Sequence, residues 1–179
     1  MYDVAVIGCG IVGAAAAYEL SRYNCRVLVL EAKNDVANVT TKANSAILHA
    51  GYDPTPGTLM AETNVRGVAL AKELCEKLDV EREEIGSLVL AFGEEDERHL
   101  EKLYQQGLAN GVPGIELLTA DEVHALEPNV SDKVTAALYA PTAAIVSPWE
   151  YALALAETAV VNGCELRLSA PVTGIDRAG

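Results

Sequence analysis

A glycine-rich segment near the N-terminus is the first place where residue types and spacing predict chemistry. It reads Gly8-Cys9-Gly10-Ile11-Val12-Gly13, so its glycines follow the pattern G-x-G-x-x-G. A short apolar run precedes it, an alanine-rich stretch follows it, and Glu31 comes eighteen residues after Gly13. The pattern alone is weak evidence, but in this context it predicts a dinucleotide-binding turn.

The glycines and the start of the following helix have separate roles in such a turn. Gly8 permits the tight turn, Gly10 lets the backbone approach a pyrophosphate, and Gly13 lets the helix pack closely against the strand. The unpaired N–H groups of the helix N-terminus, at Ile11 and Val12, would face the anion. A glycine-rich turn that binds no ligand is the alternative interpretation, which the order of strand, helix and acid disfavours.

Glu31 is the predicted partner of the adenosine ribose. It lies at the end of the second predicted strand, where its carboxylate can accept hydrogen bonds from the ribose hydroxyls. The same negative charge repels a 2′-phosphate, which argues against NADP. Nicotinamide and flavin proteins share this fingerprint, so the residues up to Glu31 leave both cofactors open.

The elements that must position these residues form a β-α-β unit. Apolar runs predict strands over 2–7 and 26–30, and the alanine-rich stretch predicts a helix over 11–23. Such a unit makes a right-handed crossover within a parallel sheet. Residues 35–57 are predicted to be irregular. The further predicted elements are helices over 58–78, 94–110 and 149–162, a helix capped at Thr119, and strands over 87–92, 134–139, 143–146, 165–168 and 172–175.

Composition and charge exclude several classes of protein. The 179 residues carry 13 basic and 26 acidic side chains, which give a formal net charge of −13. Such a chain repels phosphate backbones, so we expect no nucleic-acid partner. The four cysteines lack the spacing of zinc ligands, and no metal site is predicted. Without a long apolar span or a basic secretory leader, the sequence predicts a cytoplasmic protein.

A second block of residues distinguishes between the cofactors. The segment Asn44-Ser45-Ala46-Ile47-Leu48-His49-Ala50-Gly51-Tyr52 has the pattern N-S-x-x-x-H-A-G-Y. It resembles the D-amino-acid-oxidase-like superfamily of FAD-dependent oxidoreductases, in particular the branch of glycerol-3-phosphate dehydrogenases and L-2-hydroxyglutarate oxidases. The resemblance continues through Gly86-Ser87-Leu88-Val89, Leu126-Glu127-Pro128 and residues 141–148.

The resemblance implies FAD as the cofactor and a role for each matching residue. Gly8, Gly10, Gly13 and Glu31 would hold the ADP half of FAD. The other implied contacts are Ala32 and Lys33 beside the adenosine, Thr41 at the pyrophosphate, Asn44 and Ser45 beside the flavin, and the backbone of Val172 at the adenine.

His49 is the candidate catalytic residue. It lies among small residues in a loop-like segment, where its ring could reach the isoalloxazine or the substrate. An imidazole there could stabilise a reduced flavin anion or take a hydroxyl proton during hydride transfer. A histidine that hydrogen-bonds to the backbone and shapes the turn is an equal alternative.

The resemblance also implies an α/β fold in two parts. Residues 1–80 and 147–179 are expected to form a Rossmann-like FAD-binding domain of the glutathione-reductase type, with a parallel sheet. Residues 81–146 are expected to begin an α+β substrate domain. Enzymes of this superfamily are far longer, so the chain is interpreted as the N-terminal part of one, with an incomplete FAD-binding domain. We expect this part alone to be inactive and to self-associate through the uncovered edge of its first strand.

Hydride transfer from a substrate C–H bond to flavin is the activity that the resemblance implies. Glycerol 3-phosphate is the favoured substrate by analogy, and we expect a small anion in any case. The alternative substrates are a 2-hydroxyacid such as L-2-hydroxyglutarate and an amino acid. The alternative classes of protein are a nicotinamide dehydrogenase and a non-catalytic dinucleotide-binding module. The sequence leaves open the electron acceptor and any peripheral membrane contact of the full-length enzyme.

Overall fold

A computed structural model describes residues 1–177. The chain forms two compact units. The first contains residues 1–46, 77–81 and the chain from Ser147 onward, and the second contains residues 47–76 and 82–146. Residues 47–76 therefore belong to the second unit, whereas the sequence analysis assigned them to the first segment, residues 1–80, of the predicted FAD-binding domain. The functional division into cofactor and substrate domains stays a prediction.

A three-stranded parallel sheet forms the centre of the first unit. Its order is β1 (Val4–Ile7), β2 (Val27–Leu30) and β9 (Glu165–Arg167), so β2 has a partner on each side. The sequence Val-Leu-Val-Leu of β2 is apolar throughout, as expected for a strand covered on both faces. This sheet confirms the predicted α/β class, and its strands correspond to those predicted over 2–7, 26–30 and 165–168.

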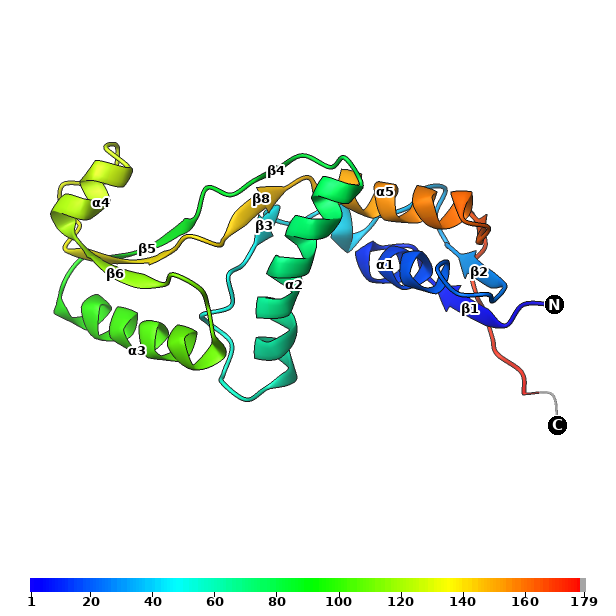
Figure 1. The fold of residues 1–179 in the computed structure, drawn as a ribbon, viewed down its shortest axis with the longest axis horizontal. Helices are drawn as coiled ribbons and strands as arrows, with labels where there is room; N and C mark the ends of the chain where they lie inside the picture. The colour runs from blue at the N-terminus through cyan, green and yellow to red at the C-terminus, as the bar shows by residue number, and fades with distance from the viewer. Residues whose placement is uncertain (178–179) are drawn as a thin grey trace. The chain divides into compact units, whose positions relative to one another are not determined.

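Two helices of the first unit pack against each other, α1 (Ile11–Leu20) and α5 (Pro148–Val161) (Figure 1). Their buried positions are mostly alanines, whose small side chains let the two backbones approach closely. The Oγ of Ser147 accepts a hydrogen bond from the Glu150 N–H at 3.2 Å and so caps the start of α5. Helix α1 ends at Leu20, and Ser21 is its C-cap residue. The sequence had predicted that this helix continues to Tyr23.

The second unit contains two three-stranded antiparallel sheets. The first has the order β3 (Ile47–Leu48), β8 (Ala144–Val146) and β4 (Arg82–Glu83). The second has the order β5 (Ser87–Ala91), β7 (Ala136–Ala140) and β6 (Glu116–Thr119). The long helix of the unit is α2 (Leu59–Lys77).

Two helices cover opposite faces of the β5-β7-β6 sheet. Leu138 of β7 packs in one cluster with Leu100 and Leu103 of α3 (Glu94–Asn110). Its neighbour Ala137 packs in another cluster with Val123 of α4 (Ala120–Leu126). Successive strand residues point to opposite faces, so this alternation fixes the register of β7.

The ends of these two helices have clear signals in the sequence. Gly111 adopts a left-handed conformation with φ +76° immediately after α3, which terminates the helix. A reciprocal capping box between Thr119 and Glu122 starts α4.

Several short elements differ from the sequence-based prediction. Strands β3, β4 and β6 and the 3-10 helix η1 (Thr40–Lys42) were not predicted. The predicted strand over 172–175 is wrong, because residues 171–177 form no strand and are exposed. The amide of Ala170 still donates to the Glu31 carbonyl at 2.8 Å. Residues 171–177 form no backbone hydrogen bond with another described segment.

No helix in residues 1–177 combines the length and the apolarity that a membrane span requires.

Candidate functional site

The glycine-rich turn between β1 and α1 has the conformation that its glycines permit. Gly8 has φ +92°, which strongly favours glycine, and its N–H donates to the Leu30 carbonyl at 2.8 Å. A Cβ atom at Gly13 would lie 2.0 Å from the Gly8 carbonyl oxygen. The first turn of α1 therefore lies directly against the turn that precedes it, and only a glycine fits at position 13.

The N-terminus of α1 presents backbone donors that the helix itself does not use. Gly10 is the N-cap residue and provides no capping side chain. The Ile11 N–H donates to Thr41 Oγ1 at 3.0 Å. Within residues 1–177, the N–H groups of Val12 and Gly13 have no hydrogen-bond acceptor. Unpaired amides at a helix N-terminus, together with the helix dipole, favour a negatively charged group.

A cavity of about 490 Å³ lies at this helix end. Its lining contains no charged side chain, so an anion there would be held by amides and hydroxyls. A Cβ at Gly10 would lie 3.0 Å from Thr41 Oγ1, which shows how closely the backbone and this hydroxyl approach. The residues that line the cavity are Val6, Ile7, Gly8, Gly10, Ile11, Val12, Gly13, Ala16, Thr40 and Thr41.

Glu31 connects the glycine-rich turn to the loop that follows β2. Its carboxylate is buried and accepts one hydrogen bond at each oxygen, from the Cys9 N–H at 2.7 Å and from the Lys33 N–H at 2.8 Å. A carboxylate oxygen has two lone pairs, so each oxygen keeps capacity for a further donor such as a ribose hydroxyl. The sequence predicted the ribose contact and missed this structural role of Glu31.

Cys9 is an uncharged member of the same turn. Burial, and then the nearby Glu31 carboxylate, raise the pKa of its thiol to about 11. The thiol therefore stays protonated at neutral pH and does not act as a nucleophile. Its backbone is what positions the turn, since the Cys9 carbonyl also accepts from the Ala37 N–H at 2.9 Å.

The structure brings the residues assigned to the adenosine end close to the segment before Val172. The Ser169 N–H donates to the Lys33 carbonyl at 2.7 Å, and Ala170 bonds to Glu31 as described above. Ala32 and Lys33 are exposed, and Val172 follows Ala170 by two residues on an exposed segment. The adenine contact of Val172 stays a prediction.

Thr41, Asn44 and Ser45 lie in and after η1. Thr41 is buried, and its hydroxyl holds the Ile11 amide as described above. The Asn44 side chain donates to the Thr41 carbonyl at 2.6 Å and accepts from the Ala46 N–H at 2.8 Å. Asn44 therefore shapes the turn into residue 46, where φ is +62°. Ser45 is exposed, and the flavin contacts of both residues stay predictions.

His49 lies in the second unit, directly after β3. Its backbone carbonyl accepts a hydrogen bond from the Asn64 side chain. Its ring is exposed and hydrogen-bonds to no group in the described chain. Ala50 is buried next to it, and a Cβ at Gly51 would lie 2.7 Å from Val65 Cγ2. The backbone therefore holds this loop, which does not support the alternative that the ring shapes the turn.

Thr40 and Ala16 line the cavity at the helix end, yet neither was predicted from the sequence. Thr40 directly precedes Thr41, so the run of two threonines was a signal that could have identified it. Ala16 lies one turn further along α1 and has no chemical signature of its own. In the chain from residue 1 to 177, no group of His, Cys, Asp and Glu side chains could hold a metal ion.

Comparison with known proteins gives a consistent set of relatives. The family model described as FAD dependent oxidoreductase (DAO) matches residues 3–179. A glycerol 3-phosphate dehydrogenase of Caloramator mitchellensis is 50% identical over 177 residues, which make up 99% of this chain and 37% of that protein. A human L-2-hydroxyglutarate dehydrogenase is 32% identical over 179 residues, with 99% of this chain and 38% of that protein covered.

A solved structure agrees with this assignment. The dithionite reduced L-alpha-glycerophosphate oxidase from Mycoplasma pneumoniae, with FAD bound, has a TM-score of 0.89 and 33% sequence identity to this chain. The match covers 96% of this chain and 46% of that one. The chain spans less than half the length of the relatives named here.

Proposed function

Because the chain belongs to the DAO family of FAD dependent oxidoreductases, we propose that its first unit holds the ADP half of FAD in an enzyme that oxidises a CH–OH group. The observation that carries this proposal is the uncharged cavity at the N-terminus of α1, with the unpaired amides of Val12 and Gly13 beside it. This donor set fits a pyrophosphate, which needs several N–H groups and a close backbone approach.

Different residues around the cavity would bind different parts of FAD. The amides of the first turn of α1 and the Thr41 hydroxyl would bind the pyrophosphate. The remaining lone pairs of Glu31 would accept the ribose hydroxyls, and its charge would exclude a 2′-phosphate. The neighbouring segments 31–33 and 169–170, which are joined by backbone hydrogen bonds, would border the adenosine.

FAD, when bound, supplies the acceptor for a hydride from the substrate carbon. For the associated proton we propose His49, whose exposed ring has no hydrogen-bond partner among the described residues. A neutral imidazole nitrogen can accept a hydroxyl proton near neutral pH. The first unit contributes binding and orientation, because no side chain that lines its cavity is acidic or basic.

Glycerol 3-phosphate is the substrate we propose. The support is the 50% identity with a glycerol 3-phosphate dehydrogenase, which extends over nearly the whole chain. L-2-hydroxyglutarate is the second candidate, supported by the 32% identity with an L-2-hydroxyglutarate dehydrogenase. Both are small anions with a CH–OH group, which agrees with the substrate class expected from the sequence.

Anaerobic reduction of bound FAD tests this function. We expect a full-length enzyme that contains this chain to bind FAD and to lose the visible flavin absorbance when glycerol 3-phosphate is added. A His49→Asn variant should bind FAD equally well and be reduced at least about 100-fold more slowly, within the range typical of a lost general base. If L-2-hydroxyglutarate reduced the flavin and glycerol 3-phosphate did not, L-2-hydroxyglutarate would be the substrate. A protein that binds NADH but not FAD would contradict the proposal.

A further inference from the structure

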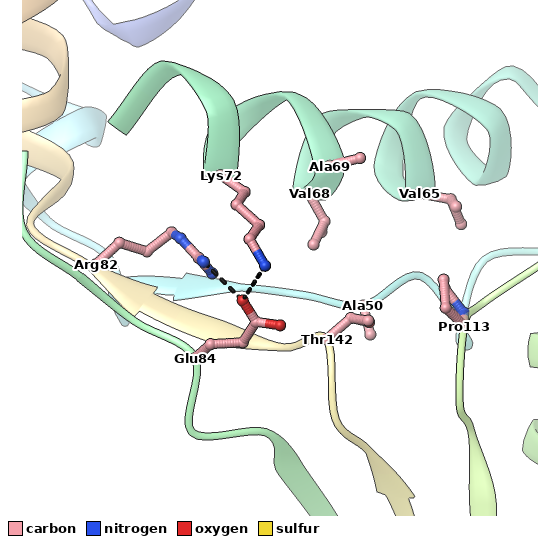
Figure 2. A pocket seen from close by; sticks show the side chains of 9 residues that line it. All are labelled: Ala50, Val65, Val68, Ala69, Lys72, Arg82, Glu84, Pro113 and Thr142. Atoms are coloured by element: carbon pink, nitrogen blue, oxygen red, sulfur yellow. Dashed lines mark hydrogen bonds and ion pairs between the residues drawn. The ribbon is translucent and has the colours of Figure 1, made fainter. Parts of the chain in front are cut away.

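A pocket of about 210 Å³ lies in the second unit, between α2 and the segments drawn below it in Figure 2. One face of α2 forms its roof, with side chains at the helical spacing i, i+3, i+4 and i+7. Nothing in the proposed binding of FAD uses this pocket. Its lining residues are Ala50, Val65, Val68, Ala69, Lys72, Arg82, Glu84, Pro113 and Thr142.

One end of the pocket is apolar. Val65, Val68 and Ala69 of α2 lie opposite Ala50 and Pro113 (Figure 2). The two valines are only half-buried and Ala69 is exposed, so this face of α2 is not closed by other side chains of the unit. Contact with a hydrocarbon group would remove this apolar surface from water, which is favourable.

The other end of the pocket is positively charged. Lys72 Nζ and Arg82 Nη2 lie 3.3 and 2.6 Å from the same carboxylate oxygen of Glu84 (Figure 2). The hydrogen bonds from Arg82, and then from Lys72, lower the pKa of the Glu84 carboxyl, so it is ionised at neutral pH. Two cations and one anion leave a local charge of +1, in a chain whose formal net charge is −13.

Two polar groups in the pocket have donors that the described residues leave unused. The Arg82 side chain is only 9% exposed, yet its single hydrogen bond to a described residue runs from Nη2 to Glu84. The Thr142 hydroxyl is fully buried and has no partner in residues 1–177. Buried polar groups are normally hydrogen-bonded, and an unpaired guanidinium donor is especially costly. Unused donors at Arg82 and Thr142 therefore point to an acceptor that enters the pocket.

We propose that this pocket binds a small monocarboxylate, with its carboxylate at Lys72 and Arg82, an oxygen within reach of the Thr142 hydroxyl, and a short hydrocarbon chain against Val65 and Val68. The local charge of +1 matches a monoanion better than a phosphate dianion. The pocket is smaller than ordinary ligand pockets, which span roughly 300–1,000 Å³. This restricts the ligand to a few carbon atoms.

Calorimetric titration of the purified full chain without FAD tests the proposal, with n-butyrate as the probe. Butyramide has the same shape without the charge, and inorganic phosphate has the charge without the hydrocarbon chain. We expect butyrate to bind at least about tenfold more tightly than butyramide, because one charge-assisted hydrogen bond contributes about 1.5 kcal/mol or more. We expect a similar preference over phosphate, because phosphate has no hydrocarbon chain to cover the apolar end of the pocket. Equal binding of butyrate and butyramide, or no binding of butyrate, would overturn the proposal.

Three variants identify the site. Lys72→Gln removes the exposed cation, leaves Glu84 paired with Arg82, and should weaken butyrate binding about tenfold or more. Thr142→Val should weaken it about threefold to tenfold through loss of the hydroxyl. Ala69→Leu adds a side chain that fills the pocket, and should abolish binding.

Lys102→Gln is the matched control. Lys102 is an exposed lysine of α3 that does not line the pocket, so its variant should bind butyrate as the wild type does. Circular dichroism of each variant shows whether it is folded. Undiminished butyrate binding by folded Lys72→Gln and folded Ala69→Leu would place the carboxylate elsewhere and overturn the proposal. Since no FAD is present, the result is independent of the proposed oxidoreductase function.

Discussion

Glu31 is the residue on which both the local structure and the proposed ribose contact depend. Its buried carboxylate satisfies the amides of Cys9 and Lys33. Glutamine at position 31 offers one acceptor oxygen, so one of these amides loses its partner. We predict that Glu31→Gln lowers the free energy of unfolding in urea by about 1–3 kcal/mol without FAD. It should also weaken FAD binding about tenfold.

Glu157→Gln is the control for this prediction. Glu157 is an exposed residue of α5, and its side chain hydrogen-bonds to no group in the described chain. Its variant should unfold like the wild type. If Glu31→Gln lost no more stability than Glu157→Gln, the carboxylate would not hold the turn as the structure indicates.

Asp3 provides a prediction of pH dependence. Its carboxylate accepts hydrogen bonds from the Arg26 side chain and from the Arg26 N–H, which join the starts of β1 and β2. The side-chain bonds, and then the backbone bond, lower the pKa of Asp3 from 3.8 to about 2. A lowered pKa stabilises the fold above the unfolded pKa, and this stabilisation is lost as the pH falls towards the folded pKa.

We therefore predict that Asp3→Asn lowers the Tm between pH 5 and 7 and that its difference from the wild type shrinks between about pH 4 and 2. Thermal unfolding across this pH range measures the difference. Asp132→Asn, at an exposed position, should show no such pH dependence. A constant difference between Asp3→Asn and the wild type from pH 6 to pH 2 would contradict the prediction.

At the scale of elements, the close approach of α1 to its preceding turn depends on Gly13. A Cβ at this position would lie 2.0 Å from the Gly8 carbonyl oxygen, and neither backbone segment can yield easily. We predict that Gly13→Ala lowers the free energy of unfolding by about 1–3 kcal/mol or more, as overpacking does elsewhere. Urea unfolding without cofactor measures this loss separately from any effect on binding.

Gly67 supplies the matched control, because it lies in the middle of α2 and a Cβ added there would have no neighbouring atom within 4 Å. Gly67→Ala should raise the free energy of unfolding by about 0.5–1 kcal/mol, since alanine is the better helix former. Equal changes in the two variants would show that helix propensity, and not the approach to Gly8, decides the outcome at Gly13.

The elements that the sequence predicted well are those with long periodic patterns or clear end signals. Helix α3 has its predicted bounds, from the acidic first turn to the stop at Gly111. The β-α-β unit around the glycine motif was also predicted, because apolar runs and a glycine turn occur in order over about thirty residues. The family resemblance in the block around His49 agreed with the family match.

The elements that the sequence missed have no periodic signal of their own. Strands β3 and β4 are two residues long and exist only because β8 lies between them. The backbone role of Glu31 and the capping of Ile11 by Thr41 join residues 22 and 30 positions apart. Such contacts depend on the tertiary fold, so a local pattern cannot reveal them.

At the scale of the whole molecule, β1 is an edge strand of the sheet in the described part of the chain. An unpaired edge can hydrogen-bond to the edge of another copy. We predict that the mass measured by sedimentation equilibrium rises with protein concentration and that Ala5→Lys, in this strand, reduces the rise. Ala109→Lys, at an exposed position of α3, should leave it unchanged. Equal self-association of all three proteins would place the contact away from β1.

The central claim is that the N-terminus of α1, with Gly10 and Thr41, receives the pyrophosphate of FAD. Calorimetric titration of FAD and ADP into the wild type, Gly10→Val and Gly67→Val tests it most directly. A Cβ at Gly10 already lies 3.0 Å from Thr41 Oγ1, and the valine branch would occupy space that the pyrophosphate needs. We predict at least about 100-fold weaker binding of both nucleotides to Gly10→Val. Gly67→Val should bind like the wild type, and equal affinities of the two variants would contradict the claim.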